Sequence, residues 1–125
     1  MATDNISVLK VRDVLLVTVP ANPDDETVMT LQDHALRAME RHEAKGLVLD
    51  IAAVETVDSF FARTIVETAS MVLLMGGRTV ITGMRPSVAI TTVELGLMFS
   101  NVLTALDVDT ALDLLDKPER GVRRP

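Results

Sequence analysis

The residues best suited to carry chemistry in this chain are Asp58 and Ser59. A short apolar run at residues 47–51, typical of a strand buried on both faces, leads through a loop at 52–57 to this pair, where a helix is expected to begin. Unpaired backbone N–H groups and the helix dipole favour an anion at such a position. The Ser59 hydroxyl is therefore a suitable phosphate acceptor, and the simpler alternative is that Asp58 or Ser59 serves only as the helix N-cap.

Other arrangements that could support catalysis or metal binding are weak. His34 and His42 are eight residues apart on one expected helix, whereas metal-binding pairs on a helix face are separated by three or four. Ser59 does not lie in a Gly-x-Ser-x-Gly motif, and Gly76-Gly77 lacks the spacing of a phosphate-binding loop. Cysteine is absent. We therefore predict no enzyme activity, no metal site and no cofactor.

The composition is typical of one small domain that acts through other proteins. The chain has 125 residues, a net charge of −6 and three phenylalanines as its only aromatic residues. Residues 117–125 carry a charge of +3, which leaves −9 for residues 1–116. Such an acidic body with few aromatic side chains is a poor surface for nucleic acid. Because no signal peptide and no apolar run of membrane-spanning length is visible, we expect a cytoplasmic protein with neither membrane nor nucleic-acid partners.

Hydrophobic periodicity predicts an α/β domain with the element order β-β-α-β-α-β-α-β-α. Residues 6–11 and 14–19 are expected to form a β-hairpin that turns at Arg12-Asp13. Helices that separate the later strands imply right-handed crossovers, so we predict a mixed, mostly parallel sheet with about four helices. The expected helices begin near residues 24, 58, 86 and 107, and the later strands cover about 47–51, 78–82 and 102–106. We expect the domain to span residues 1–117 and a disordered basic tail to span 118–125.

Helical spacing also predicts which side chains face the core. In the helix that follows Asp58, the inward residues are expected to be Phe61, Ile65, Ala69, Val72 and Leu73. In the helix that begins near Pro86, they are expected to be Val88, Thr92, Val93 and Leu95. If Phe61 did not face the core, Phe60 would be the inward residue.

Five short segments carry a resemblance to a known family. They are Leu47-Val48-Leu49-Asp50-Ile51, Val57-Asp58-Ser59, Gly76-Gly77-Arg78, Gly83-Met84-Arg85-Pro86 and Glu94-Leu95-Gly96. In order and spacing they resemble the STAS domains of anti-sigma-factor antagonists, over about residues 6–116. The usual site of that family reads Asp-Ser-Ser/Thr-Gly-Leu, whereas this chain has Asp58-Ser59-Phe60-Phe61-Ala62. This departure makes the chain more similar to the small RsbS-type scaffold proteins of the stressosome than to the free antagonists.

The resemblance implies a single STAS domain that regulates a kinase. A stressosome core subunit of this kind joins multidomain STAS paralogues, which carry sensory domains, in a large hetero-oligomer that sequesters a switch serine/threonine kinase of the histidine-kinase-like ATPase fold. The kinase would contact Asp58 and Ser59, phosphorylate Ser59 and thereby be released. A second acceptor would map to Thr91. Two alternatives are a free anti-anti-sigma factor that binds an anti-sigma kinase one to one, and an enzyme of a different class.

Overall fold

The elements follow the predicted order along the chain. The computed structural model describes residues 6–96 and 101–116. Its strands are β1 (Ser7–Val11), β2 (Val14–Thr18), β3 (Gly46–Asp50), β4 (Arg78–Thr82) and β5 (Val102–Ala105). Its helices are α1 (Asp25–His42), α2 (Ser59–Leu74), α3 (Pro86–Glu94) and α4 (Val108–Asp116). The predicted tail at residues 118–125 and the domain boundary at residue 117 lie outside the described residues.

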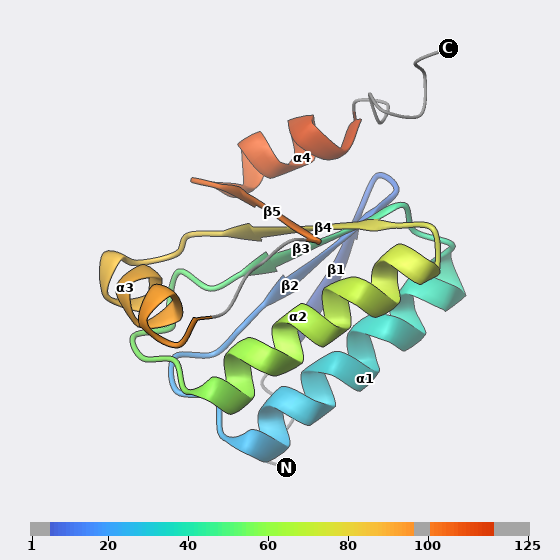
Figure 1. Ribbon diagram of the computed structural model, residues 1–125. Helices are drawn as coiled ribbons and strands as arrows, with labels where there is room; N and C mark the ends of the chain where they lie inside the picture. Colours follow the sequence, from blue (N-terminus) through green and yellow to red (C-terminus); the bar gives the residue numbers. More distant parts are fainter. Residues whose placement is uncertain (1–5, 97–100, 117–125) are drawn as a thin grey trace.

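The five strands form one mixed sheet in the spatial order β1-β2-β3-β4-β5 (Figure 1). β1 and β2 are antiparallel and are joined at Arg12-Asp13, as predicted, while β2, β3, β4 and β5 run parallel to one another. The carboxyl ends of the four parallel strands therefore meet at one edge of the sheet. This edge positions the candidate site, because the loops that follow β3 and β4 both leave from it. The predicted fold class is confirmed.

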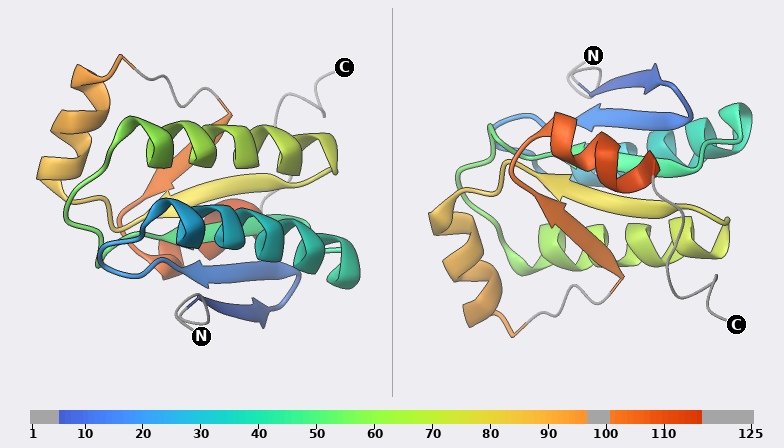
Figure 2. Two further views of the ribbon diagram at one scale, coloured as in Figure 1. Left: turned by 90° about the horizontal axis from the view of Figure 1, so that it is seen from below. Right: turned by 90° about the horizontal axis from the view of Figure 1, so that it is seen from above.

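The helices cover the two faces of the sheet unequally. α1 and α2 pack side by side on one face, α4 covers the other, and α3 lies beyond the carboxyl ends of the strands near the start of α2 (Figure 2). Side chains alternate along each strand, so each face has its own apolar cluster. The larger cluster, under α1 and α2, includes Leu15, Leu49 and Ile65. The smaller cluster, under α4, is built around Val48 and Val80.

The inward face of α2 agrees with the prediction at four of its five positions. Phe61, Ile65, Ala69 and Val72 are buried, but Leu73 is 47% exposed, so its prediction is wrong. Each step of four residues rotates the stripe by about 40°, which places Leu73 about 120° from Phe61 and off the buried face.

The prediction for α3 is correct for two residues and wrong for two. Val88 and Thr92 are buried, whereas Val93 is 77% and Leu95 is 40% exposed. α3 has only nine residues and lies at the end of the sheet, where one narrow stripe is enough to attach it. The larger of the remaining apolar side chains of α3, Ile90 and Val93, therefore face outward.

Candidate functional site

The start of α2 presents Ser59 as an exposed side chain. Asp58 is the N-cap: its backbone is extended, and its Oδ1 accepts a hydrogen bond of 2.8 Å from the backbone N–H of Phe61. Ser59 is the first helical residue, is exposed, and makes no side-chain hydrogen bond within the described part of the chain. The capping role therefore belongs to Asp58, and the Ser59 hydroxyl is left accessible.

The two phenylalanines after Ser59 anchor this turn of the helix. Phe61 is 6% exposed and belongs to the larger apolar cluster, while Phe60 is half-buried and packs against the same cluster. Phe61 thus both donates its backbone N–H to the Asp58 cap and places its ring in the core. This double attachment fixes the position from which Ser59 faces solvent.

The loop before Asp58 is held by the segment that follows β4. Arg85 Nε donates a hydrogen bond of 2.9 Å to the carbonyl oxygen of Ala52, and Ser87 Oγ donates one of 3.3 Å to that of Glu55. Arg85 Nη1 also lies 4.0 Å from Glu55 Oε2. Gly83 has a φ of 76°, and a Cβ there would lie 2.8 Å from that of Ala52. The Gly83 to Pro86 motif therefore supports the loop that presents Ser59, a function that sequence reasoning did not assign to it.

The second predicted acceptor, Thr91, has a different environment. It lies on α3, is half-buried, and donates its hydroxyl in a hydrogen bond of 3.0 Å to the carbonyl oxygen of Ser87. This is an ordinary helical interaction with the residue four positions earlier. The Thr91 hydroxyl is thus engaged, whereas that of Ser59 is not.

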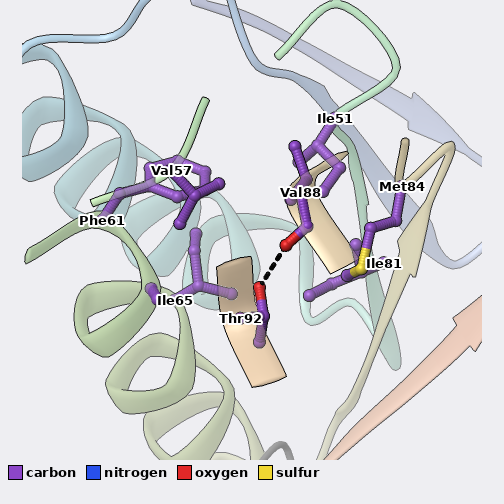
Figure 3. Close-up of a pocket in the computed structure, with 9 residues that line it drawn as sticks. Ile51, Val57, Phe61, Ile65, Ile81, Met84, Val88 and Thr92 are labelled. Atoms are coloured by element: carbon purple, nitrogen blue, oxygen red, sulfur yellow. Dashed lines mark hydrogen bonds between the residues drawn. The ribbon is translucent and has the colours of Figure 1, made fainter. Parts of the chain in front are cut away.

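An apolar pocket lies between α2 and α3 (Figure 3). Its lining consists of Ile51, Val57, Phe61, Ala62, Ile65, Ile81, Met84, Val88 and Thr92. The single hydroxyl in this lining, on Thr92, donates a hydrogen bond of 2.8 Å to the carbonyl oxygen of Val88. The free volume of the pocket, about 10 Å³, is close to that needed for one water molecule. The pocket is a small gap in the core and offers no unpaired polar group for chemistry.

A polar depression of about 270 Å³ lies beside the start of α2. It is lined by Asn22, Pro23, Thr56, Val57, Asp58 and Phe61. Asp58 is its one ionisable lining residue, and the carboxylate is already used as the helix cap. The depression therefore contains no pair of acid and base that could act on a bound molecule.

Among the described residues, the two histidines belong to no cluster of metal ligands. His34 and His42 are both exposed on α1, and no cluster of three potential metal ligands occurs among residues 6–96 and 101–116. None of the helices within these same ranges is long and apolar enough to cross a membrane.

Comparison with known proteins identifies the family. The STAS domain family model matches residues 5–111 of the chain. The chain belongs to the STAS family. Among curated proteins, the RsbT co-antagonist protein RsbRA of Bacillus subtilis (strain 168) is 30% identical over 98 residues, which are 75% of this chain but only 36% of that protein. The present chain thus matches about a third of the length of this relative.

Solved structures of stressosome proteins are also similar to this STAS domain. An RsbS from Moorella thermoacetica, with a glutamate in place of one serine, is 35% identical and has a TM-score of 0.80, covering 90% of this chain and 96% of that one. A chain from a structure of the stressosome is 35% identical with a TM-score of 0.73, covering 94% and 100%. The predicted resemblance to STAS anti-sigma-factor antagonists of the RsbS and stressosome type is confirmed.

Proposed function

We propose that this STAS domain is a non-enzymatic core subunit of a cytoplasmic stressosome, which sequesters a switch serine/threonine kinase and releases it when Ser59 is phosphorylated. The observation that carries the proposal is the division of roles at the start of α2. Asp58 caps the helix, and the neighbouring Ser59 hydroxyl is exposed and unbonded among the described residues. An acceptor for a kinase needs both this accessibility and a fixed position.

The transfer itself requires a nucleotide bound to the kinase. Ser59 Oγ attacks the γ-phosphorus of ATP, the bond from that phosphorus to the bridging oxygen breaks, and ADP leaves. The serine proton passes to a base on the kinase. The product is phosphoserine in the first turn of α2, where backbone N–H groups and the helix dipole accommodate an anion. We therefore expect the modification to leave the fold of the isolated domain unchanged.

Release follows from the charge that the phosphate adds to the docking surface, which is the surface around Asp58 and Ser59 that the kinase would contact. Phosphorylation adds about −1.5 to −2 beside Asp58 and near Glu55, both of which are exposed carboxylates. A docked kinase would have to desolvate this charge next to the carboxylates. A penalty of about 3 kcal/mol is enough to weaken binding more than a hundredfold.

The names of the relatives support the proposed partners. RsbRA is named as a co-antagonist of RsbT, and this chain matches 36% of its length. We propose that the STAS domain joins longer paralogues of this kind in a large hetero-oligomer, and that the sequestered kinase, of the histidine-kinase-like ATPase fold, corresponds to RsbT. Thr91 is proposed as a second acceptor, subordinate to Ser59 because its hydroxyl already has a hydrogen-bond partner.

The test is the affinity of the kinase for three forms of the chain. The kinase is first recovered by pull-down from native lysate and identified by mass spectrometry. Unmodified protein and Ser59→Ala should bind it equally, while protein with phosphoserine at position 59 should bind more than a hundredfold more weakly. Equal binding by all three forms would leave Ser59 with no role in release. Size-exclusion chromatography with the paralogue separates the stressosome from a free antagonist, which would form a one-to-one complex instead.

A further inference from the structure

Arg63 lies one turn of α2 after Ser59 and has no partner. It is exposed, and it makes no hydrogen bond or ion pair within the part of the chain that the structure describes. Most other arginines of that part are anchored. Arg12 contacts Asp116, Arg37 contacts Asp33, Arg85 contacts Ala52 and Glu55, and Arg78 contacts the carbonyl oxygens of Leu114 and Leu115. Arg63 is thus a free cation close to the proposed phosphorylation site.

We propose that Arg63 binds the phosphate of phosphorylated Ser59 as its partner within the same helix. This inference rests on the proposed phosphorylation of Ser59 and assigns to Arg63 a positioning function that follows it. Residues four positions apart lie on one face of a helix, with Cβ atoms about 5–6 Å from each other. Long side chains in a helix tend to point back toward its N-terminus, so an arginine at position 63 can reach the turn that begins with Ser59.

The order of the two residues favours their pairing. An anion that precedes a cation by four residues in a helix gives the more stable arrangement, because each charge then also complements the helix dipole. Ser59 and Arg63 have this order once Ser59 carries phosphate. Glu67, four residues after Arg63, has the opposite order, and the two side chains do not pair in the structure. A phosphate on Ser59 is therefore the better partner for Arg63.

The chemistry of the two groups also matches. A guanidinium presents parallel N–H donors that fit two phosphate oxygens at once, and such charge-assisted hydrogen bonds are stronger than neutral ones. The first turn of α2 contains no acidic residue that would compete from within the helix. Phosphorylation thus changes two charges on the docking surface: it adds a dianion, and it removes the free Arg63 cation from the contacts available to a partner.

The test measures the second pKa of the phosphate by phosphorus NMR. Phosphoserine is placed at position 59 of the full chain during synthesis, so no kinase is needed. Because Arg63 favours the dianion, we expect the phosphate to titrate about 0.15–0.4 of a pH unit lower in the otherwise unmodified chain than in Arg63→Gln. Arg63→Lys should keep part of this shift. At about 1 M salt the difference should disappear, because the pair is exposed.

The matched control is Arg41→Gln. Arg41 is also an exposed arginine without a partner among the described residues, but it lies in the last turn of α1, at the far end of the helix pair from Ser59. Its substitution removes the same charge and should leave the phosphate pKa unchanged. A second measurement needs no variant, since the Nε–H resonance of Arg63 should move when phosphoserine replaces Ser59.

Equal phosphate pKa values in the unmodified chain and in Arg63→Gln, with an unmoved Arg63 resonance, would overturn the inference. A kinase that neither binds nor modifies the chain would instead overturn the proposed function and leave the titration unaffected. The two failures are therefore distinguishable.

Discussion

The helices α1 and α2 begin in the same way but differ in the residues that follow the cap. Asp24 caps α1 and Asp58 caps α2, and each accepts a hydrogen bond of 2.8 Å from the backbone N–H three residues later. The first turn of α1 then contains two carboxylates, Asp25 and Glu26, whereas that of α2 contains no acidic residue and begins with Ser59. The positive end of α1 is already neutralised by its own sequence, and that of α2 is available to an added anion.

The comparison shows that a cap and an acceptor can be adjacent without competing. In α2 the aspartate satisfies a backbone N–H, and the serine one position later stays free. The same position in α1 is occupied by a carboxylate, which cannot accept phosphate from ATP as a stable ester. Both helices thus start with an aspartate cap, and the type of the residue after the cap decides whether that helix start can be phosphorylated.

The largest expected loss of stability comes from truncating the third helical residue of α2, which is more deeply buried than its counterpart in α1. Phe61 is the third helical residue of α2 and is buried, while Thr27, at the same position in α1, is half-buried. Phe61→Ala should lower the free energy of unfolding by about 3–5 kcal/mol, because it leaves a cavity in the core. Phe60→Ala is the control and should cost about 1 kcal/mol, since its ring is only half-buried. Urea denaturation measures both, and equal losses would mean that Phe61 does not anchor the turn.

The next largest loss of stability is expected at Gly83, which packs against the loop before Ser59. Gly83→Ala should lower the free energy of unfolding by about 2–4 kcal/mol, because its φ is positive and the new Cβ would meet the backbone and Cβ of Ala52. Gly76→Ala is the matched control, since Gly76 also has a positive φ but has no atom near its Cβ position. That variant should lose only the conformational part, about 1–2 kcal/mol. Similar losses in the two variants would contradict the close contact with Ala52.

The smallest effect is the pH dependence of the α1 cap. Hydrogen bonds from the side chain and the backbone N–H of Thr27 lower the pKa of Asp24 below its ordinary value of 3.8. A group whose pKa is lower in the folded state stabilises the fold above its unfolded-state pKa, and this stabilisation is lost as pH falls through the folded-state value. The thermal midpoint of the unmodified protein should therefore exceed that of Asp24→Asn at pH 6, and the gap should shrink toward pH 3. A constant gap would contradict the role of the charge.

The fold was largely predictable from local patterns, but part of the packing was not. Alternation and apolar runs located every strand, and Arg12-Asp13 marked the hairpin turn. The predicted buried face of α2 was incomplete, because Thr64 and Thr68 are also buried. A search for periodic apolar residues does not detect these two, since their side chains are polar. Thr68 accepts a hydrogen bond from Gln32 of α1 and donates one to the carbonyl oxygen of Thr64, so its burial depends on a neighbouring helix.

The residues of the candidate site were predicted from the sequence, but the contacts that hold them in place were not. The sequence placed Asp58 and Ser59 at a helix start and left open which of them was the cap, because either side chain suits that position. The structure identifies Asp58 as the cap, because its backbone is extended and its Oδ1 accepts the hydrogen bond from the backbone N–H of Phe61. The contacts of Arg85 and Ser87 with the loop before Asp58 join residues more than thirty positions apart. No local pattern encodes such contacts, so the support of the loop became visible only in the structure.

The most direct test of the central claim is to locate the phosphate after the chain is incubated with the kinase and ATP. Ser87 provides an internal control, because it is an exposed serine in the first turn of α3 whose hydroxyl already donates a hydrogen bond to the carbonyl oxygen of Glu55. Mass spectrometry of the digested protein should find phosphate on Ser59, with Ser87 unmodified and Thr91 modified less than Ser59. Phosphate on Ser87 or Thr91 with none on Ser59 would contradict the claim that the free hydroxyl at the start of α2 is the acceptor.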